Sequence, residues 1–152
     1  MRYTILIAAI AASLAAAPSG VQLWKAAEFP ALGKKLAAKV NAQKYANERI
    51  GDYGNHSLLV THRLGSGEAE VHETQVDVFI VQGGAATLVY GGTVVNPRNT
   101  APNEIRGTSI SGGEKRALGP GDIAHIPAKV PHQVLLDPGK EFTYTIVKVD
   151  TK

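Results

Sequence analysis

The feature that most constrains the fold of this chain is a series of short strand-like segments that begins near residue 57. Apolar and polar residues alternate in SLLVTHRL, VDVFIVQ, ATLVYGGTVV, DIAHIPA, HQVLLD and EFTYTIVKV. Alternation with a period of two is typical of half-buried β-strands, and the Gly91-Gly92 pair suits a two-residue hairpin turn. About eight to ten short strands at this spacing predict a β-sandwich or a small β-barrel.

A different periodicity precedes the strands. Residues 30–49 are rich in Ala and Lys. Apolar residues recur there at helical spacing: Leu32, Leu36, Val40 and Ala46. This pattern predicts an amphipathic helix, which the glycines of the GDYGNH segment then end. The sequence therefore predicts an all-β domain at residues 55–152 preceded by a helical lead at residues 20–54.

The first nineteen residues have the composition of a signal peptide. Arg2 is followed by an apolar run at residues 5–17 and by small residues before Gly20. The run is short for a membrane span, although an uncleaved anchor or a first hydrophobic helix is the alternative. A signal peptide at residues 1–19 predicts that the chain is exported to the periplasm or the extracellular medium. Once these residues are removed, no membrane span is expected. The lack of cysteines is compatible with export.

Composition and charge favour a globular protein that does not bind nucleic acid. Apolar residues make up 44% of the chain and charged residues 19%, which is not the composition of a disordered segment. The formal net charge is only +3. The basic residues are scattered and form no stripe interleaved with aromatic residues, so the usual electrostatic footprint of a nucleic-acid interface is missing.

Two segments of the strand-rich region resemble the paired motifs of the cupin family. The first family motif combines a glycine, a His-x-His pair, a downstream acid and a second glycine. Its counterparts here are Gly67, His72, Glu73, Thr74, Asp77 and the Gly83-Gly84 pair. The second motif is similar to GDIAHIPAKVPH, with Gly121, Asp122, Pro127 and His132 in step. The resemblance covers about residues 55 to 149 and implies a single-domain jelly-roll β-barrel.

In metal-binding members of this family, three His and one Glu commonly point into the barrel. The resemblance places His72 and His132 at the first and last of the His positions. Thr74 stands where the second His is expected, and Asp77 replaces the Glu. Lys129 occupies a usual glycine position. The first motif therefore lacks one of the implied histidine ligands and has a shorter acid than expected.

Strand geometry gives a separate argument for the same pocket. Residues at i and i+2 share a face of a strand, so His72 and Thr74 are expected to point the same way. Phe79 is apolar and lies two residues after Asp77, which predicts that both face the interior. Two imidazoles and one carboxylate at His72, His132 and Asp77 suit Fe, Mn or Zn as a divalent metal. The alternative is that these three side chains hydrogen-bond to one another in a metal-free pocket.

Three further residues are candidates for the pocket or its rim. His62 shares a strand face with Val60, which favours an inward side chain, and His125 precedes His132 on a neighbouring strand. Each is interpreted first as a satisfied core or rim histidine, with His125 the better candidate for a replacement ligand. The segment from Val94 to Arg116 is predicted to be an irregular, solvated connection. The alternative is a flap that uses Arg106 to hold an anion.

Two classes of function follow from these residues. In the first, the protein is an exported, metal-dependent enzyme that acts on a small oxygenated molecule, with the reaction type left open. In the second, it is a small-molecule binding module without chemistry, which uses Phe79 as an apolar wall and the polar points at His72, Thr74 and His132. A third, weaker interpretation uses the predicted helix as the contact of a homodimer.

Overall fold

The computed structural model describes residues 20–151, which form two antiparallel sheets with a helix on the outside. The five-stranded sheet has the order β1 (Tyr45–Asp52), β2 (His56–Arg63), β13 (Phe142–Asp150), β4 (Gln75–Gly84) and β11 (Ile123–Ile126). The six-stranded sheet has the order β10 (Glu114–Leu118), β5 (Ala86–Tyr90), β12 (His132–Leu135), β3 (Ala69–His72), β8 (Glu104–Gly107) and β7 (Arg98–Ala101). The strands β6 (Thr93–Val95) and β9 (Ser109–Ser111) form a separate pair.

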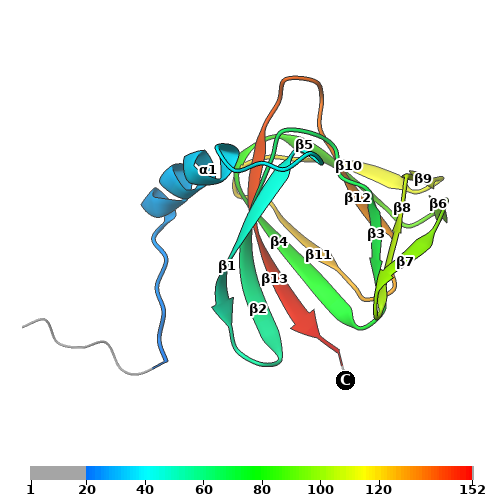
Figure 1. Ribbon diagram of the computed structural model, residues 1–152, viewed down its shortest axis with the longest axis horizontal. Helices are drawn as coiled ribbons and strands as arrows, with labels where there is room; N and C mark the ends of the chain where they lie inside the picture. The colour runs from blue at the N-terminus through cyan, green and yellow to red at the C-terminus, as the bar shows by residue number, and fades with distance from the viewer. Residues whose placement is uncertain (1–19, 152) are drawn as a thin grey trace, which may run out of the picture.

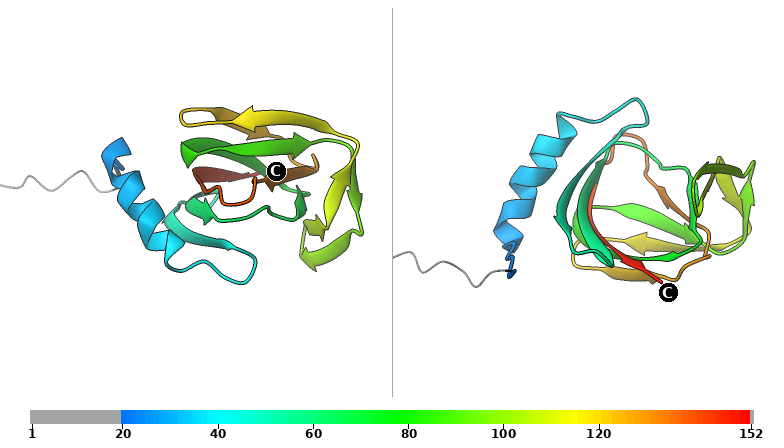
Figure 2. Two further views of the ribbon diagram at one scale, coloured as in Figure 1. Left: turned by 90° about the horizontal axis from the view of Figure 1, so that it is seen from above. Right: turned by 60° about the horizontal axis from the view of Figure 1, so that its bottom comes forward.

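The two larger sheets curve around a common interior, as Figures 1 and 2 show. One part of this interior is an apolar core, which includes Phe79, Val81, Leu88, Ile126, Val134, Phe142, Tyr144 and Ile146. These residues come from strands of both sheets, because alternate residues of each strand face inward. The predicted all-β barrel with an N-terminal helix is confirmed.

The helix is shorter than the sequence predicts. A single 3-10 turn at Ala26–Glu28 leads into α1 (Phe29–Ala37), and strand β1 begins only eight residues after α1 ends. The prediction of a helix to residue 49 was therefore wrong. Ala46 does pack against Leu36, but it does so from a strand. The backbone of β1 pairs along the whole of β2, and these tertiary hydrogen bonds override the helical periodicity of the segment.

Helix α1 lies against the outer face of the five-stranded sheet, on the opposite side of the molecule from β6 and β9 (Figures 1 and 2). Leu36 is buried there with Val60 of β2. Gly33 allows the close approach, because a Cβ at this position would lie 3.2 Å from the Thr143 hydroxyl on β13. The face of β2 that carries Val60 is thus the helix face, and the opposite face of β2 points into the barrel.

The connection between the two motif segments is ordered, contrary to the prediction of an irregular loop. Residues 94 to 116 contain β7, β8 and β9 together with the ends of β6 and β10. Asn96 and Asn103 adopt positive φ angles of 51° and 61°, which suit the tight turns between these strands. Strand β8 pairs with β3, and this pairing sets Arg106 opposite Glu70. The segment therefore forms part of the barrel wall.

Two predictions concern the N-terminal segment. The signal peptide predicted at residues 1–19 lies outside the described residues. Between residues 20 and 151, no helix has the length and apolar character that a membrane span requires.

Candidate metal centre

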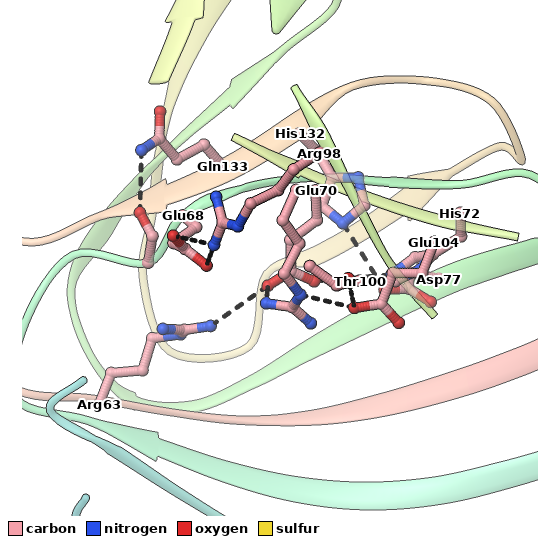
Figure 3. Close-up of polar contacts among 12 residues, drawn as sticks. Arg63, Glu68, Glu70, His72, Asp77, Arg98, Thr100, Glu104, His132 and Gln133 are labelled. Atoms are coloured by element: carbon pink, nitrogen blue, oxygen red, sulfur yellow. Dashed lines mark hydrogen bonds and ion pairs between the residues drawn. The ribbon is translucent and has the colours of Figure 1, made fainter. Parts of the chain in front are cut away.

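Three side chains meet inside the barrel where β3 pairs with β12. Glu70 and His72 are two residues apart on β3 and share its inner face, and His132 of β12 is the register partner of Glu70. The carboxylate of Glu70 and one ring nitrogen of each histidine all lie within 4.8 Å of one another. Figure 3 shows these side chains converging from the two strands. The strand register alone brings a carboxylate and two imidazoles together.

Glu70 is the member of this cluster that the sequence reasoning missed, and Thr74 is the residue that it wrongly included. Thr74 is exposed in the turn between β3 and β4. The strand ends at His72, so the period of two does not continue from His72 to Thr74. Two residues back from His72 along β3, the same alternation places Glu70 on the inner face. The two donors of β3 that share the inner face are therefore Glu70 and His72, rather than His72 and Thr74.

Asp77 lies beside this cluster on β4, as predicted, and is 2% exposed. Its Oδ2 atom is 3.4 Å from Nε2 of His72 and 3.7 Å from Nε2 of His132. Burial raises the pKa of Asp77, but the hydrogen bond with His72 and the charge of Lys148 outweigh burial and lower it. Asp77 is therefore a buried carboxylate anion within reach of both imidazoles.

His132 has the orientation and protonation state of a metal ligand. Its Nδ1 atom donates a hydrogen bond to the carbonyl of Val130 at 3.1 Å, since a carbonyl oxygen can only accept. Burial lowers the pKa of His132, more than the nearby carboxylates of Glu70 and Asp77 raise it. The ring is thus neutral, and its Nε2 lone pair faces the cluster.

His72 faces a cation as well as two carboxylates. Burial and the charge of Lys148 lower its pKa, but hydrogen bonds with Asp77 and Glu70 raise it to about 9. Nε2 of His72 also lies 2.9 Å from the Nζ of Lys148. A protonated ring would direct its own hydrogen at that ammonium, so protonation of His72 and this contact exclude each other. The contact with Lys148 is the shortest, at 2.9 Å against 3.4 Å to Asp77 and 3.6 Å to Glu70, so in the arrangement observed Lys148 donates to a neutral His72. The raised pKa applies to the ring when the carboxylates, and not Lys148, contact Nε2.

Two arginines complete the surroundings of Glu70. Arg106 donates from Nη1 to Glu70 at 2.9 Å and from Nε to Glu104. Arg63 approaches Glu70 at 3.8 Å, and Figure 3 shows these two side chains. Arg63 also donates to the hydroxyl of Tyr144 at 3.0 Å. Burial raises the pKa of Glu70, but its hydrogen bond with His72 and the two guanidinium groups lower it strongly. Glu70 is therefore ionised despite its position inside the barrel.

The cluster lies in the wall of a small cavity beside a wider hollow. The inner cavity encloses about 100 Å³ and is lined by the cluster and by Asp77, Phe79, Arg106 and Lys148, among others. A second hollow of about 710 Å³ shares Tyr45, Arg63, Glu68, Glu104 and Arg106 with it. The inner cavity is much smaller than a typical ligand pocket, so it suits a metal ion and a few ligand atoms.

The remaining predicted residues divide between the pocket and other surfaces. Phe79 and Arg106 do line the cavity. His62 is buried but on the outer face of β2, where its Nδ1 lies 2.9 Å from the Thr143 hydroxyl beneath α1. His125 is exposed because it pairs with Val78, whereas its neighbours Ala124 and Ile126 pair with the inward Phe79 and Asp77. His62 is therefore a buried histidine, as first interpreted, but on the outer face of the sheet, and His125 lies outside the cluster.

The donor set fits a divalent transition metal. Two imidazole nitrogens and one carboxylate with open positions beside them suit Fe(II), Mn(II) or Zn(II). The Nδ1 hydrogen bond of His132 is the support that ligating histidines usually have. Glu70, His72 and His132 could hold the ion, and Asp77 lies close enough to join or orient them. Lys148 is the feature that opposes this fit, because it contacts Nε2 of His72.

Comparisons with solved structures agree on the fold. TT1209 from Thermus thermophilus is 21% identical and matches with a TM-score of 0.56, covering 78% of this chain and 94% of that chain. KdgF from Halomonas sp. is 17% identical, with a TM-score of 0.53 and coverage of 74% and 85%. A sugar phosphate isomerase of the cupin superfamily from Silicibacter pomeroyi is 18% identical, with a TM-score of 0.50 and coverage of 71% and 60%.

These likenesses confirm that the chain has the cupin fold. No protein-family model and no curated protein sequence matches it. The molecule is thus a cupin-fold protein with a buried cluster of two histidines and one glutamate that could bind a metal.

Proposed function

We propose that this protein is an exported metal-binding cupin that acts on a small oxygenated molecule at Glu70, His72 and His132. The observation that carries the proposal is the convergence of these three donors within 4.8 Å inside the barrel. The register of β3 and β12 keeps the three donors together.

The residues around the cluster have separable roles in such a reaction. Glu70, His72 and His132 would hold a divalent metal, which would supply Lewis-acid chemistry there. Arg106 orients Glu70 through its hydrogen bond and presents a positive charge to the wider hollow. Asp77 provides a carboxylate that can accept a proton near the reacting atoms. Phe79 packs its edge against His132 and excludes water from one side.

The dimensions of the two hollows restrict the substrate. The inner cavity admits only a few non-hydrogen atoms, whereas the wider hollow holds a larger group. Arg63 and Arg106 line both spaces. A molecule with an oxygen-bearing end inside the barrel and an anionic or hydroxylated part at these arginines fits this arrangement.

The metal content of the purified protein tests this proposal. We expect close to one divalent transition metal per chain by elemental analysis of protein never exposed to a chelator. His72→Ala and His132→Ala should abolish that content, because each removes an imidazole donor. His125→Ala is the matched control, since it removes an exposed histidine outside the cluster. Wild-type protein with little metal, unchanged by either cluster substitution, would favour a binding module without chemistry.

Export forms a separate part of the proposal and has its own test. It is supported by Arg2, the apolar run of residues 5–17 and the small residues that follow. Mass spectrometry of protein from the periplasm or medium should detect a new N-terminus between residues 18 and 21. Recovery of the chain with an intact Met1 from the cytosol would refute export but leave the metal proposal standing.

A further inference from the structure

Lys148 occupies a position in the cluster that neither motif accounts for. It is the register partner of Asp77 on the neighbouring strand, so both side chains point into the barrel. Its Nζ donates to Oδ1 and Oδ2 of Asp77 at 2.8 and 3.0 Å and to Nε2 of His72 at 2.9 Å. The ammonium therefore lies between a proposed metal ligand and the carboxylate beside it.

We propose that Lys148 is an internal competitor of the metal, and this inference rests on the proposed function of Glu70, His72 and His132. In the metal-free protein its ammonium group binds His72 and Asp77. Metal binding requires Lys148 to leave Nε2 of His72. Lys148 thereby sets how tightly the cupin holds its metal.

The chemistry of the imidazole ring makes the two states exclusive. A neutral ring has one nitrogen with a lone pair, and in His72 that lone pair accepts a hydrogen bond from Lys148. A metal–imidazole bond uses the same lone pair at a distance of about 2.0 Å. An ammonium group 2.9 Å from Nε2 cannot remain in place when a metal bonds to that nitrogen.

Charge balance in the cavity wall leads to the same conclusion. Six charged side chains of the wall, three acidic and three basic, ion-pair with one another: Glu70, Asp77, Glu104, Arg63, Arg106 and Lys148. The fourth carboxylate of the wall, Glu68, is neutralised by Arg98 outside the cavity. These charges already cancel, so a divalent cation added without displacing a positive group would leave an excess of buried positive charge. Arg63 and Arg106 contact Oε1 of Glu70, whose Oε2 faces His72 and can still bind a metal. Lys148 instead occupies the lone pair of Nε2 of His72. Lys148 is therefore the cation that metal binding displaces.

The same displacement exposes a further donor. Asp77 is paired with Lys148, and its Oδ2 lies 3.4 Å from Nε2 of His72. When Lys148 moves away, Asp77 loses its counter-ion and attracts the metal as a fourth ligand or a close neighbour. In the metal-free state the lysine prevents Asp77 from being a buried, unpaired anion. One side chain thus stabilises the metal-free fold at the expense of metal affinity.

Zn²⁺ affinity of chelator-treated protein at neutral pH tests the inference. Lys148→Leu should bind Zn²⁺ roughly 10- to 100-fold more tightly than wild type, in the range of effects that neighbours of metal ligands have. Lys148→Gln should also bind more tightly, because its amide keeps a hydrogen bond to Asp77 without the charge. It serves as the second variant if Lys148→Leu fails to fold. Lys115→Leu removes an exposed lysine of β10 and should leave the affinity unchanged.

The outcomes separate this inference from the proposed function. Equal Zn²⁺ affinity in wild type and both Lys148 variants would overturn the competitor and keep the metal centre. Zn²⁺ binding by the variants alone would support the competitor and reject a metal function for the wild-type chain. No binding by any of the proteins would overturn both.

A measurement on the wild-type protein covers the case in which both Lys148 variants misfold. Lysine acylation followed by peptide mass spectrometry should show slow reaction at Lys148, whose side chain is 19% exposed and hydrogen-bonded. Saturating Zn²⁺ should raise that rate several-fold relative to Lys115 in the same sample. An unchanged rate at Lys148 in protein that binds Zn²⁺ would contradict displacement.

Discussion

Two buried histidine environments lie on opposite faces of the five-stranded sheet, and they differ in what surrounds each ring. His62 is 3% exposed beneath helix α1, where its Nδ1 contacts the Thr143 hydroxyl. Its Nε2 lies 3.8 Å from the carboxylate of Glu141 and has no hydrogen-bond partner within residues 20–151. His72 and His132 are similarly buried, but they face each other, Glu70 and Asp77 inside the barrel. Burial alone therefore does not make a histidine a ligand. A metal site needs several donors that converge, which His72 and His132 have around them and which His62 lacks in the described part of the chain.

The largest expected effect comes from breaking the inner cluster at its carboxylate. Glu70→Gln should abolish metal loading, because the neutral amide keeps the shape but loses the anionic donor. Elemental analysis of the purified variant checks this. Glu68→Gln is the charge-matched control, since Glu68 pairs with Arg98 outside the cluster. Full metal loading in Glu70→Gln would show that Glu70 is not a ligand. Loss of metal in Thr74→Val would show instead that Thr74 supports the site, as the sequence predicts.

The contact of helix α1 with the outer face of the five-stranded sheet should depend on apolar packing rather than on a metal. Leu36 is 1% exposed and packs against Ala46 and Val60. Leu36→Ala should lower the free energy of unfolding by about 2–5 kcal/mol, because it removes buried methyl groups and leaves a cavity. Denaturant unfolding measures this, with Leu23→Ala as the control at a side chain that is 77% exposed. Metal content per folded chain should not change, and a loss of metal would link the helix face to the cluster.

Acidification should lower the stability of the protein through His62. Burial lowers the pKa of His62, more than the facing Glu141 raises it, and Lys34 of α1 lines the same hollow. The unfolded chain therefore takes up the proton first, and stability should fall as the pH drops below the ordinary value of 6.5. His62→Gln should flatten this dependence relative to wild type in unfolding experiments across that range. The same slope in both proteins would show that His62 does not contribute.

The smallest effect is expected at the exposed histidine of the same sheet. His125→Ala should change neither metal content nor the free energy of unfolding, because its side chain is exposed and pairs with the outward face of β4. Elemental analysis and denaturant unfolding check both statements. Loss of metal in this variant would mean that His125 replaces a ligand after all.

Much of the inner environment could be predicted from the sequence. The period of two predicted the strands, and the resemblance of residues 121–132 to a cupin motif identified His132 and the fold. Asp77 was predicted to face inward because it shares a strand face with the apolar Phe79, and both line the cavity. These inferences succeeded because they depend on the local geometry of one strand at a time.

The sequence alone determined the all-β barrel, its N-terminal helix and the candidate residues His72, Asp77 and His132. Only the tertiary structure decided which donors meet. A period of two assigns residues to two faces but does not say which face is the interior, so His62 was misplaced beneath α1. Glu70 joins His132 through the pairing of β3 with β12, and Lys148 reaches Asp77 through the pairing of β13 with β4. These pairs are 62 and 71 residues apart in the chain, and long-range strand register, which no local pattern encodes, brings their charges together.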